Sequence, residues 1–317
     1  MMKTNMVKTN ISVICPVALK PEDTIAIIAP AGPIMARDSF ENGVATLERL
    51  GFRVRFDDRI FQSVRYLAGS DADRAEELTR VIQDPSVQAI VALRGGYGCA
   101  RLIPLLEEKR LRSHPKIFMG FSDLTTLHLL FNSWGWCTFH GPMAATDTMA
   151  TISAEQSRHL FSLWTDPDYL PTLHFAELET WAPGVAEGIL TGGCLSLIVA
   201  SLGTAYEIET EGKILLLEDV GEPAYRIDRM LTHLRLSGKL GAASGILLGR
   251  FADCEPEEGS GYSVADVLQD VLSGLDVPIL ANFPAGHIRD NWTLPLGVRV
   301  RLDANACMLQ FLEPAVR

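Results

Sequence analysis

Short apolar runs alternate with helical patterns through about residue 145, and this alternation limits the possible folds more than any other feature of the chain. Each apolar run is expected to be a buried strand, and each helix carries the chain back to start the next parallel strand. The expected strands are 24–29, 52–56, 87–93 and 116–120, and the expected helices are 38–50, 70–83, 100–107 and 124–133. The pattern predicts an α/β fold with helices on both faces of a parallel sheet.

The remainder of the chain is less regular and predicts a second domain. Residues 145–185 are punctuated by Pro and Gly, so we expect a connecting segment there. Short strand candidates follow at 185–190, 213–218, 244–248, 277–280 and 297–302, with helical segments between them. The predicted organisation is an N-terminal extension (1–22), an α/β domain (23–165), a linker (166–184) and a C-terminal domain of mixed β and α structure (185–317).

The composition is that of a globular protein, with 47% hydrophobic and 21% charged residues. At 317 residues the chain can bury a large core without the support of disulfides or metal ions. Its net charge of -11 argues against nucleic acid and anionic membranes as partners, because both are bound through clustered Lys and Arg. A small acidic substrate stays open, since one local Arg can override the average charge.

Features of cellular location point to the cytoplasm. The N-terminal sequence lacks the long apolar run of a secretory signal, and no run of about 18 apolar residues occurs that could span a membrane. The six cysteines are scattered without a C-x-x-C pair, so neither a zinc knuckle nor a redox motif is expected. Such cysteines are typical of buried small residues in a reducing compartment.

Three loops, at 30–33, 94–98 and 120–123, follow expected strands and so lie at the edge where parallel sheets bind ligands. In the third loop an apolar strand runs into the motif Gly-Phe-Ser-Asp, and a helix follows at once. A serine at such a turn places its hydroxyl beside free N–H groups that stabilise negative charge. Ser122 is therefore a candidate nucleophile. The alternative is a plain helix N-cap, and Leu124 replaces the second glycine of the G-x-S-x-G elbow.

The loop Arg94-Gly95-Gly96-Tyr97-Gly98 carries three glycines directly after a strand, which lets its backbone approach a ligand closely. The N–H groups of these glycines can complete an oxyanion hole beside the serine. A phosphate-binding loop and a plain turn are the alternatives. Neither G-x-G-x-x-G nor the P-loop motif is present, so a nucleotide site is disfavoured.

Two further residues would complete a hydrolytic site. Glu218 ends an apolar strand, where a carboxylate is partly desolvated and can orient an imidazole, although a turn acid facing water is the alternative. His287 lies in a Gly-flanked loop and can act as a general base, and His140 is its rival because it also follows an apolar segment. No H-E-x-x-H motif and no histidine pair at helical ligand spacing occurs, so we expect metal-free chemistry and no cofactor.

Several long stretches keep one order along the chain from residue 23. They are TIAIIAPAGP (24–33), ALRGGYGCARL (92–102), GFSDLTTLH (120–128), FHGPM (139–143), EGILTGGCLSL (187–197), KILLLEDVGEPAYRIDRML (213–231), GILLGRF (245–251) and PAGHIRDNWTLPLG (284–297). In these stretches the chain resembles the LD-carboxypeptidase family of serine peptidases, also called the muramoyltetrapeptide carboxypeptidase family. That family includes the microcin-immunity peptidases.

The resemblance implies an architecture and a catalytic triad. It implies a Rossmann-like or flavodoxin-like N-terminal domain and a smaller, β-rich, swivelling C-terminal domain, commonly in a homodimer. The family's nucleophile is the serine of its GxSD turn, which corresponds to Ser122. Its glutamate in the LEDxxE segment corresponds to Glu218, and the histidine of its GHxxxNxTLPxG segment corresponds to His287. The triad would then form only where the two domains meet.

The resemblance also implies the oxyanion donors. Family members place them in the Gly-rich loop and at the Asp after the serine, which points to the backbone of Gly95 or Gly96 and of Asp123. One departure is visible, because the family often has Asn after the Gly-Gly pair where this chain has Cys194. If that Asn supports the site, its support is altered here.

The implied reaction is hydrolysis of the L,D peptide bond that releases the terminal D-alanine of murein tetrapeptides during peptidoglycan recycling. A microcin-type peptidase acting on peptidyl- or aminoacyl-nucleotides is the alternative within the fold, and a non-catalytic small-ligand binding protein is the alternative outside it. A carboxypeptidase must also bind a terminal carboxylate. Arg94, beside the oxyanion loop, is a candidate clamp without family precedent, and Tyr97 is a second candidate substrate contact.

Overall fold

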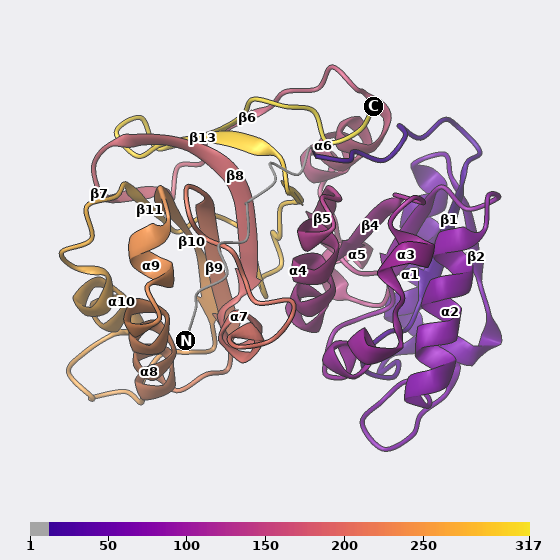
Figure 1. The fold of residues 1–317 in the computed structure, drawn as a ribbon, viewed down its shortest axis with the longest axis horizontal. Helices are drawn as coiled ribbons and strands as arrows, with labels where there is room; N and C mark the ends of the chain where they lie inside the picture. The colour runs from indigo at the N-terminus through magenta and orange to yellow at the C-terminus, as the bar shows by residue number, and fades with distance from the viewer. Residues whose placement is uncertain (1–12) are drawn as a thin grey trace, which may run out of the picture.

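The computed structural model of the protein describes residues 13–317, which form two β-sheets lying side by side (Figure 1). The first twelve residues of the predicted N-terminal extension lie outside the described part of the chain. Its remaining part runs beside the C-terminus, where Ala18 N donates a hydrogen bond to Arg317 O over 3.0 Å. The two ends of the described chain therefore meet.

The first sheet has six strands in the order β12-β5-β4-β3-β1-β2. Its parallel strands are β1 (Thr24–Ile28), β2 (Arg53–Phe56), β3 (Ala89–Ala92), β4 (Ile117–Gly120) and β5 (Thr138–His140). Their order is that of flavodoxin-like sheets, in which the strand order reverses between β1 and β3 and ligands bind at that point. The predicted parallel sheet is confirmed.

Helices connect and cover the strands of both sheets. They are α1 (Arg37–Arg49), α2 (Asp71–Gln83), α3 (Glu108–Leu111), α4 (Thr125–Ser133), α5 (Asp147–Ala150), α6 (Ala154–Thr165), α7 (Leu195–Ser201), α8 (Ala224–Leu236), α9 (Lys239–Ala242) and α10 (Val264–Leu272). Among residues 13–317, none of them combines the length and apolar character that crossing a membrane requires. The helix expected over 100–107 is instead a pair of 3₁₀ turns, Cys99–Arg101 and Ile103–Leu105, because Pro104 has no N–H to donate to a continuous helix.

Both faces of the first sheet are buried, as the continuous apolar runs predict. Ile25 and Ile27 of β1 pack on one face with the apolar residues of α1 and α6. The alternate residues Ala26 and Ile28 pack on the other face with those of α2 and α4. Because side chains alternate along a strand, this double burial requires an apolar residue at every position.

The second sheet has eight strands in the order β6-β14-β13-β8-β9-β10-β11-β7. They are β6 (Thr172–Leu173), β7 (Glu179–Ala182), β8 (Val185–Cys194), β9 (Ile214–Val220), β10 (Gly245–Ala252), β11 (Ile279–Ala281), β13 (Arg299–Asp303) and β14 (Met308–Phe311). The central strands β8 to β11 are parallel, and the strands that flank them are antiparallel. Figure 1 shows the long strand β8 arching over this half of the molecule.

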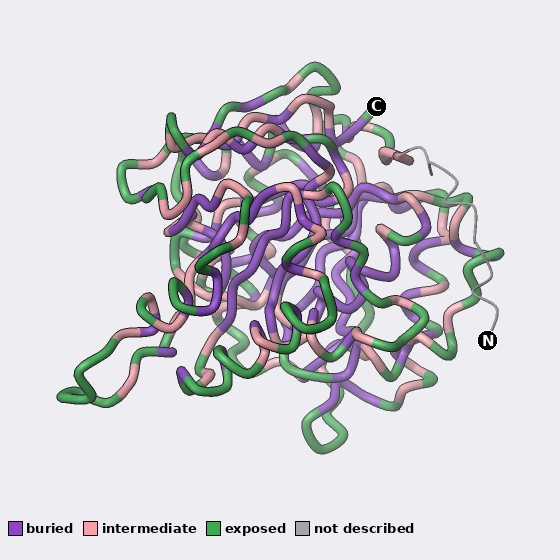
Figure 2. Tube along the Cα trace, turned by 60° about the vertical axis from the view of Figure 1, so that its left-hand side comes forward, coloured by how far each residue is buried: buried purple, intermediate pink, exposed green. Residues whose placement is uncertain are grey.

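The two sheets share one apolar core. Helices α7, α8 and α10 cover one face of the second sheet. Leu216 and Leu247, on its other face, belong to the same buried cluster as Phe139 of the first sheet. Figure 2 shows the buried segments running through the middle of the molecule, with exposed loops around the rim. Burial of this shared surface holds the two halves together.

Two segments tie the halves together more closely than the predicted boundaries suggest. The expected linker, 166–184, contains β6 and β7, which form opposite edges of the second sheet. Strand β12 (Leu294–Leu296) lies late in the sequence but pairs antiparallel with β5 of the first sheet. The domain division at 165 and 185 stays a prediction.

Candidate active site

Ser122 lies at the sharp turn between β4 and α4, as the sequence pattern predicts. Its φ of 64° is left-handed, a conformation that costs about 1–2 kcal/mol in a residue with a side chain. Gly120 permits the turn, because a Cβ there would lie 2.8 Å from Leu124 Cγ. Neither the 3₁₀ turn that begins at Ser122 nor α4 receives a side-chain cap hydrogen bond, so the serine is not a helix cap. Strain of this kind is concentrated at functional sites.

The Gly-rich loop lies directly against the serine. A Cβ on Gly95 would lie 2.9 Å from Ser122 Oγ and 3.5 Å from Asp123 N. The next residue, Gly96, has a φ of 111°, which favours glycine. The predicted oxyanion loop, the serine hydroxyl and the backbone N–H after the serine therefore lie together.

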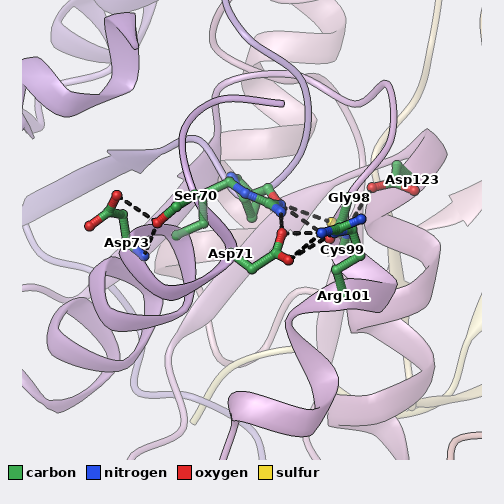
Figure 3. A network of polar contacts seen from close by, with 9 residues as sticks. Ser70, Asp71, Asp73, Gly98, Cys99, Arg101 and Asp123 are labelled. Atoms are coloured by element: carbon green, nitrogen blue, oxygen red, sulfur yellow. Dashed lines mark hydrogen bonds and ion pairs between the residues drawn. The ribbon is translucent and has the colours of Figure 1, made fainter. Parts of the chain in front are cut away.

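A network of polar contacts holds the Gly-rich loop in place (Figure 3). Arg74 of α2 is 2% exposed and donates hydrogen bonds to the backbone oxygens of Pro30 and Gly98, so it joins the loops after β1 and β3. Asp71 pairs with Arg74 at 2.5 Å and with Arg101 at 2.6 Å. The sequence pattern does not reveal the role of Arg74, because an Arg in an amphipathic helix is ordinarily exposed.

Asp123 links the serine turn to the same loop. Its carboxylate is 1% exposed and accepts a hydrogen bond from Cys99 N at 2.8 Å. Burial raises the pKa of this carboxyl group, and the hydrogen bond from Cys99 opposes the rise. The side chain of Asp123 therefore positions the Gly-rich loop, while its backbone N–H lies at the serine turn, directly after Ser122.

Glu218 and His287 form a direct hydrogen-bonded pair. Glu218, near the end of β9, is fully buried, and its Oε2 accepts a hydrogen bond from His287 Nδ1 at 2.8 Å. Gly286 has a φ of 114°, and a Cβ there would lie 2.5 Å from Glu218 Oε2. The glycine therefore lets the loop approach the carboxylate. The His287 side chain is 16% exposed and lines a pocket.

His140, at the end of β5, lies on the other side of the same carboxylate. In sequence His140 is a rival of His287, but the structure places both imidazoles beside Glu218. His140 is fully buried, and its Nε2 lies 3.6 Å from Glu218 Oε1, just beyond hydrogen-bond distance. Burial opposes ionisation of Glu218, but the two imidazoles outweigh it and lower the pKa of this carboxyl group to about 2. Glu218 is therefore a carboxylate at neutral pH.

Phe121 connects the serine turn to the histidine loop. Its ring contacts that of His287 edge to face, with the centroids 4.9 Å apart. Both residues line a pocket of about 620 Å³, together with Asp147 and Arg289. Among the described residues no hydrogen bond joins Ser122 directly to His287, a contact that in unliganded hydrolases is often long and tightens with substrate.

A second pocket, of about 520 Å³, opens beside the Gly-rich loop and contains both predicted substrate contacts, Arg94 and Tyr97. Arg94 Nη1 donates a hydrogen bond to Pro33 O at 3.1 Å, and burial lowers the pKa of the guanidinium group. The Tyr97 ring is 47% exposed, and its centroid lies 5.8 Å from that of Tyr66. Tyr66 belongs to no recognisable motif, so no sequence pattern marks it as a site residue.

Cys194, where the chain departs from the family, lies between the two halves. Its backbone N–H donates to Thr125 Oγ1 of α4 at 3.1 Å. Its Sγ lies 3.4 Å from Asp219 Oδ1, and Asp219 also accepts a hydrogen bond from Ser196 N. The cysteine therefore belongs to the support of the site.

Within residues 13–317, no group of three or more His, Cys, Asp or Glu side chains is arranged to hold a metal ion. The imidazoles of His140 and His287 both lie beside the carboxylate of Glu218. Metal-free chemistry stays a prediction.

Two family models match the chain. That of the LD-carboxypeptidase N-terminal domain matches residues 25–141, and that of the LD-carboxypeptidase C-terminal domain matches residues 187–302. A protein of Bacillus subtilis named "Probable murein peptide carboxypeptidase" is 36% identical over 91% of this chain and 91% of its own length. The "Murein tetrapeptide carboxypeptidase" of Pseudomonas aeruginosa is 34% identical over 89% of this chain and 93% of its own length.

Solved structures agree with these relatives. The muramoyltetrapeptide carboxypeptidase of Oxalobacter formigenes superposes with a TM-score of 0.80 at 30% identity, over 90% of this chain and 97% of that one. The microcin C7 self immunity protein MccF, in complex with aspartyl sulfamoyl adenosine, superposes with a TM-score of 0.88 over 96% of this chain and 100% of that one. At 24% identity this second likeness concerns the fold alone. The matched models and relatives, together with the serine turn, show that this chain belongs to the LD-carboxypeptidase family of serine-type carboxypeptidases.

Proposed function

We propose that Ser122 attacks the carbonyl carbon of the last peptide bond and forms an acyl-enzyme. The observation that carries this proposal is the strained serine turn, with Gly95 against the hydroxyl and the Glu218–His287 pair reached through Phe121. As the bond forms, Nε2 of His287 takes the hydroxyl proton and then returns it to the leaving amine. A water molecule, deprotonated by the same imidazole, then releases the acyl group.

Glu218 prepares His287 for this exchange. Its carboxylate accepts the Nδ1–H of His287, so the unprotonated nitrogen of the neutral ring is Nε2, the atom that must receive the serine proton. The lowered pKa of Glu218 means that it stays charged when the imidazolium forms. The charge pair is shielded from water, because the carboxylate is fully buried.

The oxyanion is assigned to backbone N–H groups. Gly95 or Gly96 and Asp123 supply these donors, since Gly95 lies against Ser122, Gly96 is the next residue of the same loop and Asp123 follows the serine. Fixed donors of this kind stabilise the tetrahedral intermediate without reorganising during the reaction. Arg74 and the Asp123 carboxylate keep the loop in place.

The proposed substrate is a murein tetrapeptide, and the product released is its terminal D-alanine. The names of the relatives in Pseudomonas aeruginosa and Oxalobacter formigenes support this substrate class. Arg94 would bind the terminal carboxylate, and Tyr97 would pack against the peptide in the pocket that they share. The reaction requires neither a metal ion nor an organic cofactor.

The deciding experiment measures D-alanine release from L-Ala–γ-D-Glu–diaminopimelate–D-Ala by the wild type and by Ser122→Ala. Release by the wild type alone supports both the substrate and the nucleophile. Release by neither protein would reject the murein substrate. Equal release by both would reject Ser122 as the nucleophile.

A second candidate function is hydrolysis of a peptidyl- or aminoacyl-nucleotide. The exposed Tyr66–Tyr97 pair at the mouth of the second pocket favours it, because two rings there can stack a nucleobase. Binding of aspartyl sulfamoyl adenosine, measured by calorimetry with wild type and Tyr97→Ala, tests this alternative. A non-catalytic binding role would require that the wild type hydrolyse neither substrate class.

We also propose a cytoplasmic homodimer. The location is supported by six free cysteines among the described residues, which suit a reducing compartment. The dimer is supported only by the family resemblance. Sedimentation of the purified protein at several concentrations tests it.

A further inference from the structure

The imidazole of His140 is buried without a partner for either ring nitrogen. Both Nδ1 and Nε2 of His140, and Oε1 of Glu218, lack hydrogen bonds in the structure. All three atoms lie in fully buried side chains, where an unpaired polar group is destabilising. Two of them, His140 Nε2 and Glu218 Oε1, lie 3.6 Å apart and face each other.

We propose that His140 is a positioning residue for the reaction, and that its Nε2–H donates to Glu218 Oε1 when substrate draws the two sheets together. The proposal rests on the proposed function, because it requires Glu218 to orient His287. With one donor on each oxygen, the carboxylate plane is fixed and Oε2 stays on His287 Nδ1. The site then contains two imidazoles on one carboxylate rather than a simple triad.

The contact between His140 and Glu218 joins the two sheets. His140 ends β5 of the first sheet, whereas Glu218 lies in β9 of the second. Strand β12 pairs with β5 so that Leu294 lies opposite His140, and Leu294 is only a short loop away from His287. The two imidazoles are therefore linked both through the carboxylate and through the chain. A shift of less than about 1 Å between the sheets makes or breaks the hydrogen bond, given its usual length.

The protonation state follows from the neighbours of the carboxylate. Glu218 faces His287 and His140 on its two sides, with Asp219 next along the chain and Cys194 at the end of the adjacent strand. His128 of α4 lies beside His140 and bonds Gly120 O through its own Nε2. Among residues 13–317, Glu218 is the carboxylate that faces His140 Nε2, which selects the tautomer with a proton on that nitrogen.

The experiment compares His140→Leu, which removes the donor, with His140→Gln, whose amide can replace Nε2–H. In His140→Leu we expect kcat for D-alanine release to fall about 10- to 100-fold with KM within about twofold, because the donor acts on the triad and not on substrate. His140→Gln should recover most of the lost rate. The acid limb of the kcat/KM profile should move to higher pH in His140→Leu only, since an unshared carboxylate charge holds the proton on His287 more tightly.

The matched control is His159→Gln, a buried histidine whose Nε2 donates to Thr293 O at 2.9 Å and which, among the described residues, has no hydrogen bond to Ser122, Glu218 or His287. Its activity should stay within about twofold of the wild type. Equal losses in His140→Leu and His140→Gln, with unmoved pH profiles, would overturn the inference and leave His140 a packing residue.

A second measurement separates this inference from the substrate assignment. A fluorophosphonate probe should label the wild type and fail to label Ser122→Ala, and its labelling rate should fall in His140→Leu and recover in His140→Gln. If the wild type is labelled but releases no D-alanine, the murein substrate is wrong, and the labelling rates decide the role of His140. If the wild type is not labelled at all, both the proposed triad and the proposed role of His140 are rejected.

Discussion

Gly95 leaves room for the hydroxyl of Ser122: a Cβ on this glycine would lie 2.8 Å from Ser122 Cβ and 2.9 Å from Oγ. The backbone of Gly95 does not have a left-handed φ, so an alanine would fit its conformation. Contact with the serine is therefore the main obstacle to a side chain at position 95. The close approach of the loop is a requirement of the site, not of the turn.

We expect Gly95→Ala to lower kcat at least about 100-fold, because the methyl group separates the oxyanion donors from the serine. The added methyl should also destabilise the fold, and Ser122→Gly in the same chain should remove that cost by removing the clash. Gly241→Ala is the control, since no atom lies within 4 Å of a Cβ there. Steady-state kinetics and urea unfolding test the set. Full activity of Gly95→Ala would contradict the assignment.

Glu218 should make the fold more sensitive to acid. Its pKa is lowered in the folded protein from 4.5 to about 2, so its ionised form contributes stability above about pH 4.5. That contribution is lost as the pH falls from about 4.5 toward 2. The difference in unfolding free energy between wild type and Glu218→Gln should therefore shrink over this range. Urea unfolding at pH 6, 5, 4 and 3 measures it, and curves that stay parallel would count against the lowered pKa.

The two arginines that share Asp71 should differ sharply in their effect on stability. Arg74→Ala should cost about 1–3 kcal/mol, because it removes a buried guanidinium group and takes from Pro30 O its main hydrogen-bond donor. Arg101→Ala should change stability far less, since its side chain is 39% exposed. Urea unfolding of both variants gives the comparison, and equal effects would be inconsistent with the network in Figure 3.

Substitutions of two arginines that line different pockets should show which pocket binds the terminal carboxylate of the substrate. Arg94→Ala should raise KM for the peptide acid far more than for its C-terminal amide, whereas Arg289→Ala should not distinguish the two. Kinetics with both substrates and both variants test this. If only Arg289→Ala shows the selective effect, the carboxylate binds in the pocket beside His287 instead.

The local patterns predict the first sheet and the loops at its edge well, because strands buried on both faces leave continuous apolar runs. Ser122 follows such a run, and its turn is visible in the sequence as a glycine and a small polar residue before a helix. Glu218 and His287 are far apart in the sequence, and only the resemblance to a family joins them. Their contact at 2.8 Å depends on how two sheets pack, which no local pattern encodes.

Other parts of the site leave no local signal. Arg74 is indistinguishable in sequence from a surface arginine of an amphipathic helix, yet it is 2% exposed. His140 looks like a competitor of His287, because a sequence shows which residues are candidates but not on which side of a carboxylate they lie. The short strand Leu294–Leu296 contains Pro295 and pairs with a distant edge, so neither its propensity nor its neighbours predict it.

That strand has a consequence for dividing the protein. A fragment that ends after α6 would lack β12 and would expose the edge of β5, including the backbone beside His140. Exposed edges of this kind recruit other chains and promote aggregation. The N-terminal half should therefore be insoluble or misassembled alone, and should be rescued by a peptide carrying residues 288–298 supplied in trans, by strand donation. The half of the chain that carries Ser122 is completed by the half that carries His287.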